Sequence, residues 1–447
     1  MPEHQPEGSL PHSGVVRARC LWLAALATIL LSPEPASGQA VTPLPQDELD
    51  FQGRASLALG SGARALGMGG AFLARADDAT AASWNPAGLS YLRLPEISLV
   101  GVSNNSDTVT TPTTGAVEDS RVRASEPDFM AAAMPVDAGK VSGAVQVSFQ
   151  RVLSLDAERT IHRQNARIEQ DFQGGFDVLA LGTGLKVTRS LRLGFTLNRW
   201  LNGYRQTRVR EGVNRTIQDI DFQLSGWNVN FGALWSPNES LNVGAVVKTP
   251  FEAPVRLERT RQDVFPVSGA PRSNSFVSED VRLELPAAIG FGVSWRPRSP
   301  LTISADYTRT FWSSARIRNF FTLPIAGDPA PPDTLFETLN YPAVDEEFQE
   351  DTEQFRLGAE YVVIGPHLKI PFRAGFFTDR QYFRGGNGRA PVFVGLTLGT
   401  GIIVGPLLFD VAFVREIGDY LDREGNGIDV RIRRLYLSLI YRHRGSS

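Results

Sequence analysis

Long polar loops and very short turns alternate along this chain from about residue 93 to the C-terminus, and this alternation constrains its fold more than any other feature. The segments between them predict about fourteen β-strands. The short connections fall at residues 137–140, 189–190, 236–239, 297–299, 365–368 and 405–406. The long ones cover roughly residues 104–126, 153–175, 204–219, 251–280, 313–351, 381–390 and 418–430. Because all the long loops then lie at one end, we predict an all-β, transmembrane, antiparallel up-and-down β-barrel.

Side chains in the predicted strands alternate in polarity. In residues 301–308, odd positions are apolar and even positions are mostly polar, and residues 191–198, 284–296 and 354–363 follow the same pattern. Successive strand residues face opposite sides, so each strand has one apolar face and one polar or small face. Charged groups facing lipid cost several kcal/mol, so the polar face points inward. Aromatic residues near strand ends are expected at the membrane interfaces: Trp200, Trp235, Trp295, Trp312 and Tyr441.

One segment departs from this alternation. Phe222 and Leu224 occupy even positions, whereas Trp227 and Phe231 occupy odd ones. We predict one strand here, with a β-bulge at Ser225-Gly226 that returns the apolar side chains to a common face.

The composition of the chain is consistent with an exported membrane protein that crosses the bilayer with strands rather than helices. The net charge is −3 and 21% of residues are charged, values that a barrel shares with soluble proteins because only alternate residues face lipid. The order of basic, apolar and small residues predicts a signal peptide over residues 1–40, which contains the only cysteine, Cys20. Lys plus Arg (45) and Asp plus Glu (48) nearly balance, which argues against nucleic-acid binding.

Residues 41–92 precede the predicted wall at residues 93–447 and are rich in Gly and Ala. A barrel of this size is too wide for its own side chains to fill, so this segment is a candidate plug, or hatch, inside the lumen. Its Gly60-x-Gly62 pattern lacks the strand–helix–strand unit of a dinucleotide site. Asp77 and Asp78 favour ion pairs with Arg64 or Arg75 over a metal site, since no His or Cys lies near. We therefore expect no metal and no cofactor.

The run from Gly60 to the Ala-Asp-Asp-Ala-Thr-Ala sequence, followed by Asn85-Pro86-Ala87-Gly88-Leu89, resembles the outer-membrane long-chain fatty-acid transporter family (FadL/TodX type). The wider superfamily includes PorV-like barrels that take part in protein secretion. The resemblance implies a fourteen-strand barrel, passive uptake of hydrophobic compounds such as long-chain fatty acids, and gating by the hatch. It also implies a wall opening at a kinked third strand, about residues 141–152, where Gly143 could ease the kink. The hatch and gating residues it indicates are Gly67, Gly69, Gly70, Asp77, Asp78, Asn85, Pro86, Ala87 and Gly88.

Three functions follow as hypotheses. A channel for a carboxylate ligand needs an inward cation, and the candidates are Arg192, Arg296, Arg356 and Arg373, each of which could instead pair with a lumenal carboxylate. The alternative is a non-transport barrel that acts as a secretion or interaction partner, which a sealed lumen would favour. An embedded enzyme is disfavoured, because His162, His367 and His443 lie in loops, turns or the terminus rather than beside a nucleophile.

Location and partners follow from the barrel. We expect the outer membrane of a Gram-negative-type bacterium, contacts with outer-membrane lipid and lipopolysaccharide, a hydrophobic small-molecule ligand, and the outer-membrane assembly machinery during biogenesis.

Overall fold

The computed structural model describes residues 60–113, 118–139, 141–163, 166–212, 215–264, 271–320, 344–347, 350–422 and 425–443. The predicted signal peptide (1–40) and the first part of the predicted hatch (41–59) lie outside these residues. None of the helices in the described ranges is long and apolar enough to cross a bilayer.

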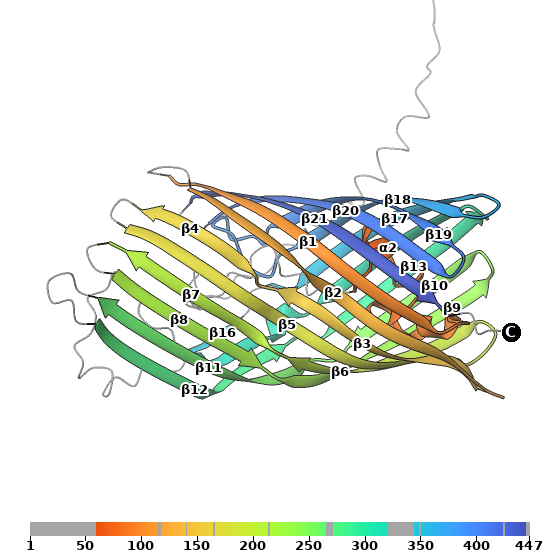
Figure 1. Ribbon diagram of the computed structural model, residues 1–447, viewed down its shortest axis with the longest axis horizontal. Helices are drawn as coiled ribbons and strands as arrows, with labels where there is room; N and C mark the ends of the chain where they lie inside the picture. The colour runs from red at the N-terminus through yellow and green to blue at the C-terminus, as the bar shows by residue number, and fades with distance from the viewer. Residues whose placement is uncertain are drawn as a thin grey trace, which may run out of the picture. The chain divides into compact units, whose positions relative to one another are not determined.

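The wall is a closed antiparallel barrel of 14 strands, which confirms the predicted fold class (Figure 1). The first strand pairs with the last, from Glu96 opposite Arg442 to Thr111 opposite Gly427. Closure leaves no unpaired strand edge in lipid, where unmade backbone hydrogen bonds are costly. The wall strands in chain order, with interrupted strands given as two segments, are β1 (Glu96–Thr111), β2 (Glu118–Ala138), β3 (Val141–Ser154) with β4 (Ala157–Arg163), β5 (Ala166–Lys186), β6 (Leu191–Leu201) with β7 (Gly203–Glu211), β8 (Arg215–Leu224) with β9 (Gly226–Asn238), β10 (Leu241–Lys248) with β11 (Phe251–Val264), β12 (Pro271–Leu285) with β13 (Ala288–Arg298), β14 (Leu301–Thr310) with β15 (Arg316–Phe320), β16 (Val344–Glu347) with β17 (Thr352–Ile364), β18 (Lys369–Arg380), β19 (Val392–Val404), β20 (Leu407–Leu421) and β21 (Gly427–Arg442).

Seven of these strands are interrupted at a similar level, which divides the wall into two parts. Toward the long loops, β4, β7, β8, β11, β12, β15 and β16 pair with one another and with the first half of β5 in a second ladder, the outer sheet. The other segments of the interrupted strands form the base of the barrel, on the side of the short turns, together with the lower parts of β1, β2 and β18 to β21, which run unbroken toward the long loops. Among the described strands, β5 alone runs unbroken through both ladders, pairing with β4 and β7 above and with β3 and β6 below.

Outward-facing side chains of the base form an apolar belt. Leu398, Leu396 and Val147 are 64%, 60% and 60% exposed in the isolated chain, which is the expected state of side chains that contact lipid. Trp235, Trp295 and Tyr441 also face outward, as predicted for interfacial aromatics. The closed wall and this belt place the protein in the outer membrane of a Gram-negative-type bacterium.

The expected bulge at Ser225-Gly226 is wrong. Trp200 pairs with Gly226 and Gly203 with Gln223, so the register is the same on both sides of the interruption. Phe222 and Leu224 are buried inside the barrel, while Trp227 faces outward. The strand keeps its phase, and the apolar side chains change faces because the outer sheet has an apolar interior.

The apolar interior of the outer sheet also explains the positions of two tryptophans that the sequence placed at the membrane interface. Trp200 and Trp312 (in the short 3-10 helix Trp312–Ser314) are buried in the interior cluster of the outer sheet.

The third strand also differs from expectation. It pairs regularly at Gly143, and its irregularity comes later, at Arg151–Leu153 and in the gap before β4.

Candidate functional site: the inner segment and its seat

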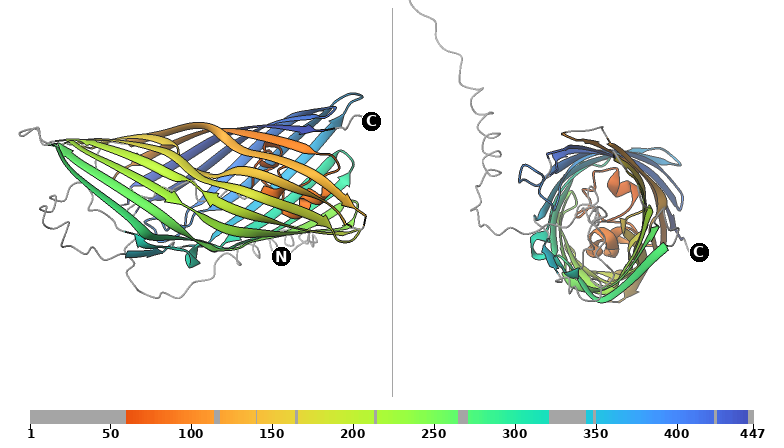
Figure 2. Two further views of the ribbon diagram at one scale, coloured as in Figure 1. Left: turned by 60° about the horizontal axis from the view of Figure 1, so that its bottom comes forward. Right: turned by 90° about the vertical axis from the view of Figure 1, so that its left-hand side faces the viewer.

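Residues 60–92, here called the inner segment, lie inside the base of the barrel (Figure 2, right). They form helix α2 (Ala63–Leu66), helix α3 (Ala81–Trp84) and the 3-10 helix η1 (Pro86–Tyr91), and most of their side chains are buried. Gly69 and Gly70 link the first helix to the next turn with φ of 66° and 74°, a conformation that favours glycine.

Glycines on the inner face of the wall make room for this segment. A Cβ at any of them would overlap or crowd the inner segment's atoms, as at Gly184, 2.6 Å from Pro86 O, and Gly399, 2.9 Å from Gly67 Cα. The others whose added Cβ would lie within 3.0 Å of the inner segment are Gly194, Gly232, Gly244, Gly290, Gly292, Gly358 and Gly375. The small residues of the predicted polar face are therefore the seat of the inner segment.

Asn85 joins the inner segment to the wall. Its side-chain amide donates to the carbonyl oxygens of Leu73 (2.9 Å), Ala233 on β9 (3.1 Å) and Ala245 on β10 (3.4 Å). Its side-chain oxygen accepts from the Ala87 N–H at 3.2 Å, which caps η1, and Pro86 takes the first position of that helix. Asn85 is fully buried, so its loss would remove the hydrogen bonds that these buried carbonyl groups accept from it.

Gly67, Gly69 and Gly88 are also held closely. The Gly69 N–H donates to Thr397 Oγ1 at 2.9 Å, and the Thr397 hydroxyl donates to the Gly67 carbonyl at 3.0 Å. A Cβ at Gly88 would overlap the Ala76 carbonyl within the segment itself. Nearby, Asp306 of β14 accepts the backbone N–H groups of Phe72 (2.6 Å) and Leu73 (2.8 Å).

Asp77 and Asp78 pair with arginines, as the sequence indicated. Arg64 contacts Asp77 at 2.6 Å and Asp78 at 3.1 Å, and Arg75 also pairs with Asp77. Burial alone would raise the pKa of Asp77, but Arg64 and Arg75 outweigh it and hold that pKa below its usual range. Burial opposes ionisation of Arg64 too, and the surrounding carboxylates still raise its pKa.

This cluster continues into the wall through Glu360 of β17. Glu360 accepts from Arg64 (3.4 Å), Arg75 (3.3 Å) and Arg373 of β18 (2.8 Å), and Arg373 also pairs with Asp410 of β20 at 2.7 Å. The cluster therefore has three cations and four carboxylates, and it connects the inner segment to three strands. Breaking a buried pair of this kind is costly, because the remaining charge is left uncompensated.

The four arginines proposed as ligand anchors are dispersed and largely engaged. Arg373 belongs to the ion cluster, and Arg296 is exposed at the short-turn end of β13. Arg192 lies over the Tyr91 ring at 4.0 Å, at the end of η1. Arg356 donates to Gln354 (2.6 Å) and to the Gly69 carbonyl (3.3 Å). The structure does not bring these four together.

An apolar cluster fills the interior of the outer sheet, beyond the inner segment. Aromatic rings pack closely in it: Tyr204 stacks on Phe222 with ring centres 5.2 Å apart, and Trp312 lies 5.5 Å from Tyr382. Most of its aliphatic members come from β5, β8, β11 and β12, and Leu153 at the end of β3 and Leu155 just after it also belong to it. The hydrophobic interior was missed from the sequence because every apolar position was assigned to the lipid face.

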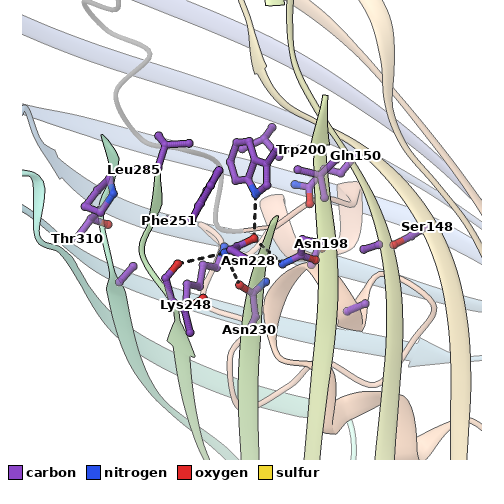
Figure 3. A pocket seen from close by; sticks show the side chains of 18 residues that line it. Ser148, Gln150, Asn198, Trp200, Asn228, Asn230, Lys248, Phe251, Leu285 and Thr310 are labelled. Carbon is purple, nitrogen blue, oxygen red and sulfur yellow. Dashed lines mark hydrogen bonds between the residues drawn. The ribbon is translucent and has the colours of Figure 1, made fainter. Parts of the chain in front are cut away.

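A cavity of about 70 Å³ lies between this cluster and the inner segment (Figure 3). Trp200, Phe251 and Leu285 line its apolar side, and Ala82 and Ser83 of the inner segment line the other.

Three asparagines form the polar edge of the same cavity. Asn228 accepts from Trp200 Nε1 (2.8 Å) and Asn198 (3.0 Å) and donates to Asn230 (3.3 Å). The cavity's cation is Lys248 of β10, a residue that sequence reasoning missed. The signal was present, because Lys248 continues the inward series of Gly244 and Val246.

A closed barrel with an apolar belt and an occupied lumen defines an outer-membrane β-barrel of the kind seen in several solved structures. A FadL homologue of Pseudomonas aeruginosa matches with a TM-score of 0.60 at 13% identity, over 86% of this chain and 99% of that chain. The P. putida toluene transporter TodX matches with a TM-score of 0.59 at 13% identity, over 87% and 99%. The Ralstonia pickettii toluene transporter TbuX matches with a TM-score of 0.57 at 16% identity, over 86% and 99%.

The family is shown by sequence. The BamG family model matches residues 60–426, and the chain therefore belongs to the BamG family. A comparison with curated proteins returns no match.

Proposed function

We propose that this protein is a passive outer-membrane channel for hydrophobic compounds, gated by the inner segment. The observation that carries the proposal is the apolar interior of the outer sheet, which leads to a cavity against the inner segment. A pore for polar solutes would have a wetted, polar lining at this level. The solved barrels of the same fold include proteins described as toluene transporters, which supports a hydrophobic cargo and a transport role rather than an enzymatic one.

The cargo class we favour is an amphipathic carboxylate such as a long-chain fatty acid. Its chain would lie among Trp200, Phe251 and Leu285, and its carboxylate would meet Lys248 and the Asn228 amide. A cavity of about 70 Å³ is smaller than the roughly 300 Å³ or more of a ligand pocket. Uptake therefore requires the aromatic cluster or the inner segment to move.

Deleting residues 61–83 tests the gating role. The wall's backbone ladder closes on itself, so the shortened protein should assemble as a barrel that passes small ions and hydrophobic solutes faster than the full chain. Assembly is checked by the gel-mobility shift between unheated and boiled samples, and passage by liposome swelling and conductance. Unchanged passage through an assembled deletion variant would show that the inner segment does not gate.

A second candidate is a non-transport barrel that serves as a secretion or interaction partner, including a partner of the outer-membrane assembly machinery. The close seat of the inner segment favours it, since nine wall glycines pack against the segment and a buried ion cluster joins it to the wall. Stoichiometric copurification of another protein in mild detergent, with normal hydrophobic uptake in cells that lack this chain, would support this role over the channel.

A further inference from the structure

Outward-facing arginines gather where the first and last strands close the barrel. β20, β21, β1 and β2 lie side by side in that order (Figure 1). One row of outward-facing residues across these strands consists of Arg415, Arg433, Asn105 and Arg123. The next outward-facing row toward the long loops contains Arg431, Asp107 and Arg121. We call the five exposed arginines the arginine patch: Arg121, Arg123, Arg415, Arg431 and Arg433.

The patch carries more positive charge than its neighbours neutralise. Asp107 pairs with Arg433 and, at 3.4 Å, with Arg121. Within the described ranges, Arg123, Arg415 and Arg431 have no carboxylate at ion-pair distance. The next outward acids on β20 and β21, Asp419 and Asp429, lie further toward the loops.

The patch borders the apolar belt on the long-loop side. Phe413 and Leu435 occupy the outward positions just below Arg415 and Arg433, and they are 42% and 41% exposed. Two residues along a tilted strand raise a side chain by about 5 Å, so the arginines lie at the level of lipid headgroups while Phe413 and Leu435 contact acyl chains.

We propose that the arginine patch binds the phosphate groups of a lipid A molecule in the outer leaflet, with its acyl chains against Phe413 and Leu435. Guanidinium groups bind phosphate through paired, charge-assisted hydrogen bonds, and several of them on adjacent strands match a headgroup with more than one phosphate. This site is outside the lumen and does not depend on the proposed channel.

The test compares lipid binding by the full chain and the triple variant Arg123→Ala/Arg415→Ala/Arg433→Ala. The probes are purified lipid A and its dephosphorylated form, each added to detergent-solubilised protein and counted by native mass spectrometry. Each arginine near the headgroups should contribute about fivefold to the affinity for lipid A, so the triple variant should bind lipid A roughly 100-fold more weakly. Dephosphorylated lipid A should bind weakly and equally to both proteins.

The control Arg167→Ala/Arg205→Ala/Arg256→Ala removes the same charge from exposed positions on β5, β7 and β11 and should bind lipid A like the full chain. Both variants must show the folded barrel's gel mobility. Equal lipid A binding by the patch variant, or an equal loss in the control, overturns the proposal. So does a patch variant that keeps lipid A but loses a protein partner or self-association, because the patch would then be a protein interface.

Discussion

At the scale of single residues, charge inside the barrel is mostly engaged in holding the structure together. The sequence left two roles open for Arg373, a ligand anchor or a partner in a lumenal ion pair. In the structure, Arg373 pairs with Glu360 and Asp410. Sequence patterns identify which residues face inward but not which of them meet a carboxylate. That depends on cross-strand register, which a single sequence does not fix.

Asn85→Ala should slow uptake of hydrophobic compounds about fivefold without lowering the amount of assembled protein. The substitution removes the donor to Leu73, Ala233 and Ala245 and uncaps η1, at a cost of about 1 kcal/mol or more, so the cavity floor shifts. Uptake by cells at equal protein abundance measures the effect. Asn238→Ala, in an exposed turn, is the control. Wild-type uptake by the Asn85 variant would exclude a role for this contact.

Lys248→Met should reduce uptake of a long-chain fatty acid about tenfold and leave toluene uptake unchanged, because only the acid presents a carboxylate to this cation. Methionine keeps most of the side-chain volume. Lys369→Met, beside an exposed turn, should alter neither substrate. Equal losses for acid and toluene would assign Lys248 a structural role instead.

At the scale of elements, the inner segment and the wall are matched surfaces. Sequence alone placed a Gly- and Ala-rich segment ahead of the wall and predicted a small or polar inner face on the strands. It could not show that wall glycines such as Gly375 and Gly358 face the backbone of Met68 and Gly69, because that match is made between elements distant in the chain.

Gly375→Val should reduce assembled barrel in the full chain but be tolerated when residues 61–83 are deleted. The new side chain overlaps the backbone at Met68 and Gly69, and the deletion removes that obstacle. Gly101→Val is the control, since the nearest atom to its added Cβ is 3.8 Å away. Heat-modifiable protein is quantified on gels. A Gly375 variant that fails equally with and without residues 61–83 would point to a defect of the wall alone.

At the scale of the whole molecule, the alternation of loop lengths was sufficient to predict the closed 14-strand barrel and its location. The division of the wall was not predictable. An apolar residue in a strand is predicted to face lipid wherever it occurs, and only the structure shows that residues such as Phe222 and Trp200 point into the lumen.

Ion leakage caused by protonation of Asp77 should be absent from about pH 8 to about pH 5 and should appear only in stronger acid. The pKa of Asp77 is held below that of an unfolded aspartate, about 3.9. Its contribution to seating the inner segment is therefore complete above that value and lost as the pH falls through the lower, folded-state pKa. Conductance in planar bilayers across this range is the measurement. A rise between pH 8 and pH 5 that disappears in an Asp77→Asn variant would contradict it.

The interruptions that separate the outer sheet from the base have a mechanical consequence. Among the strands of the outer sheet, only β5 continues unbroken into the base, whereas β1, β2 and β18 to β21 belong to the other half of the wall and are continuous. Strain applied to the loops of the interrupted strands is therefore not passed along a continuous strand to the membrane-embedded part. Under a pulling force on the loops of the interrupted strands, the barrel should yield in two events. The outer sheet would unfold first, and the base would remain in the membrane with the inner segment still inside it.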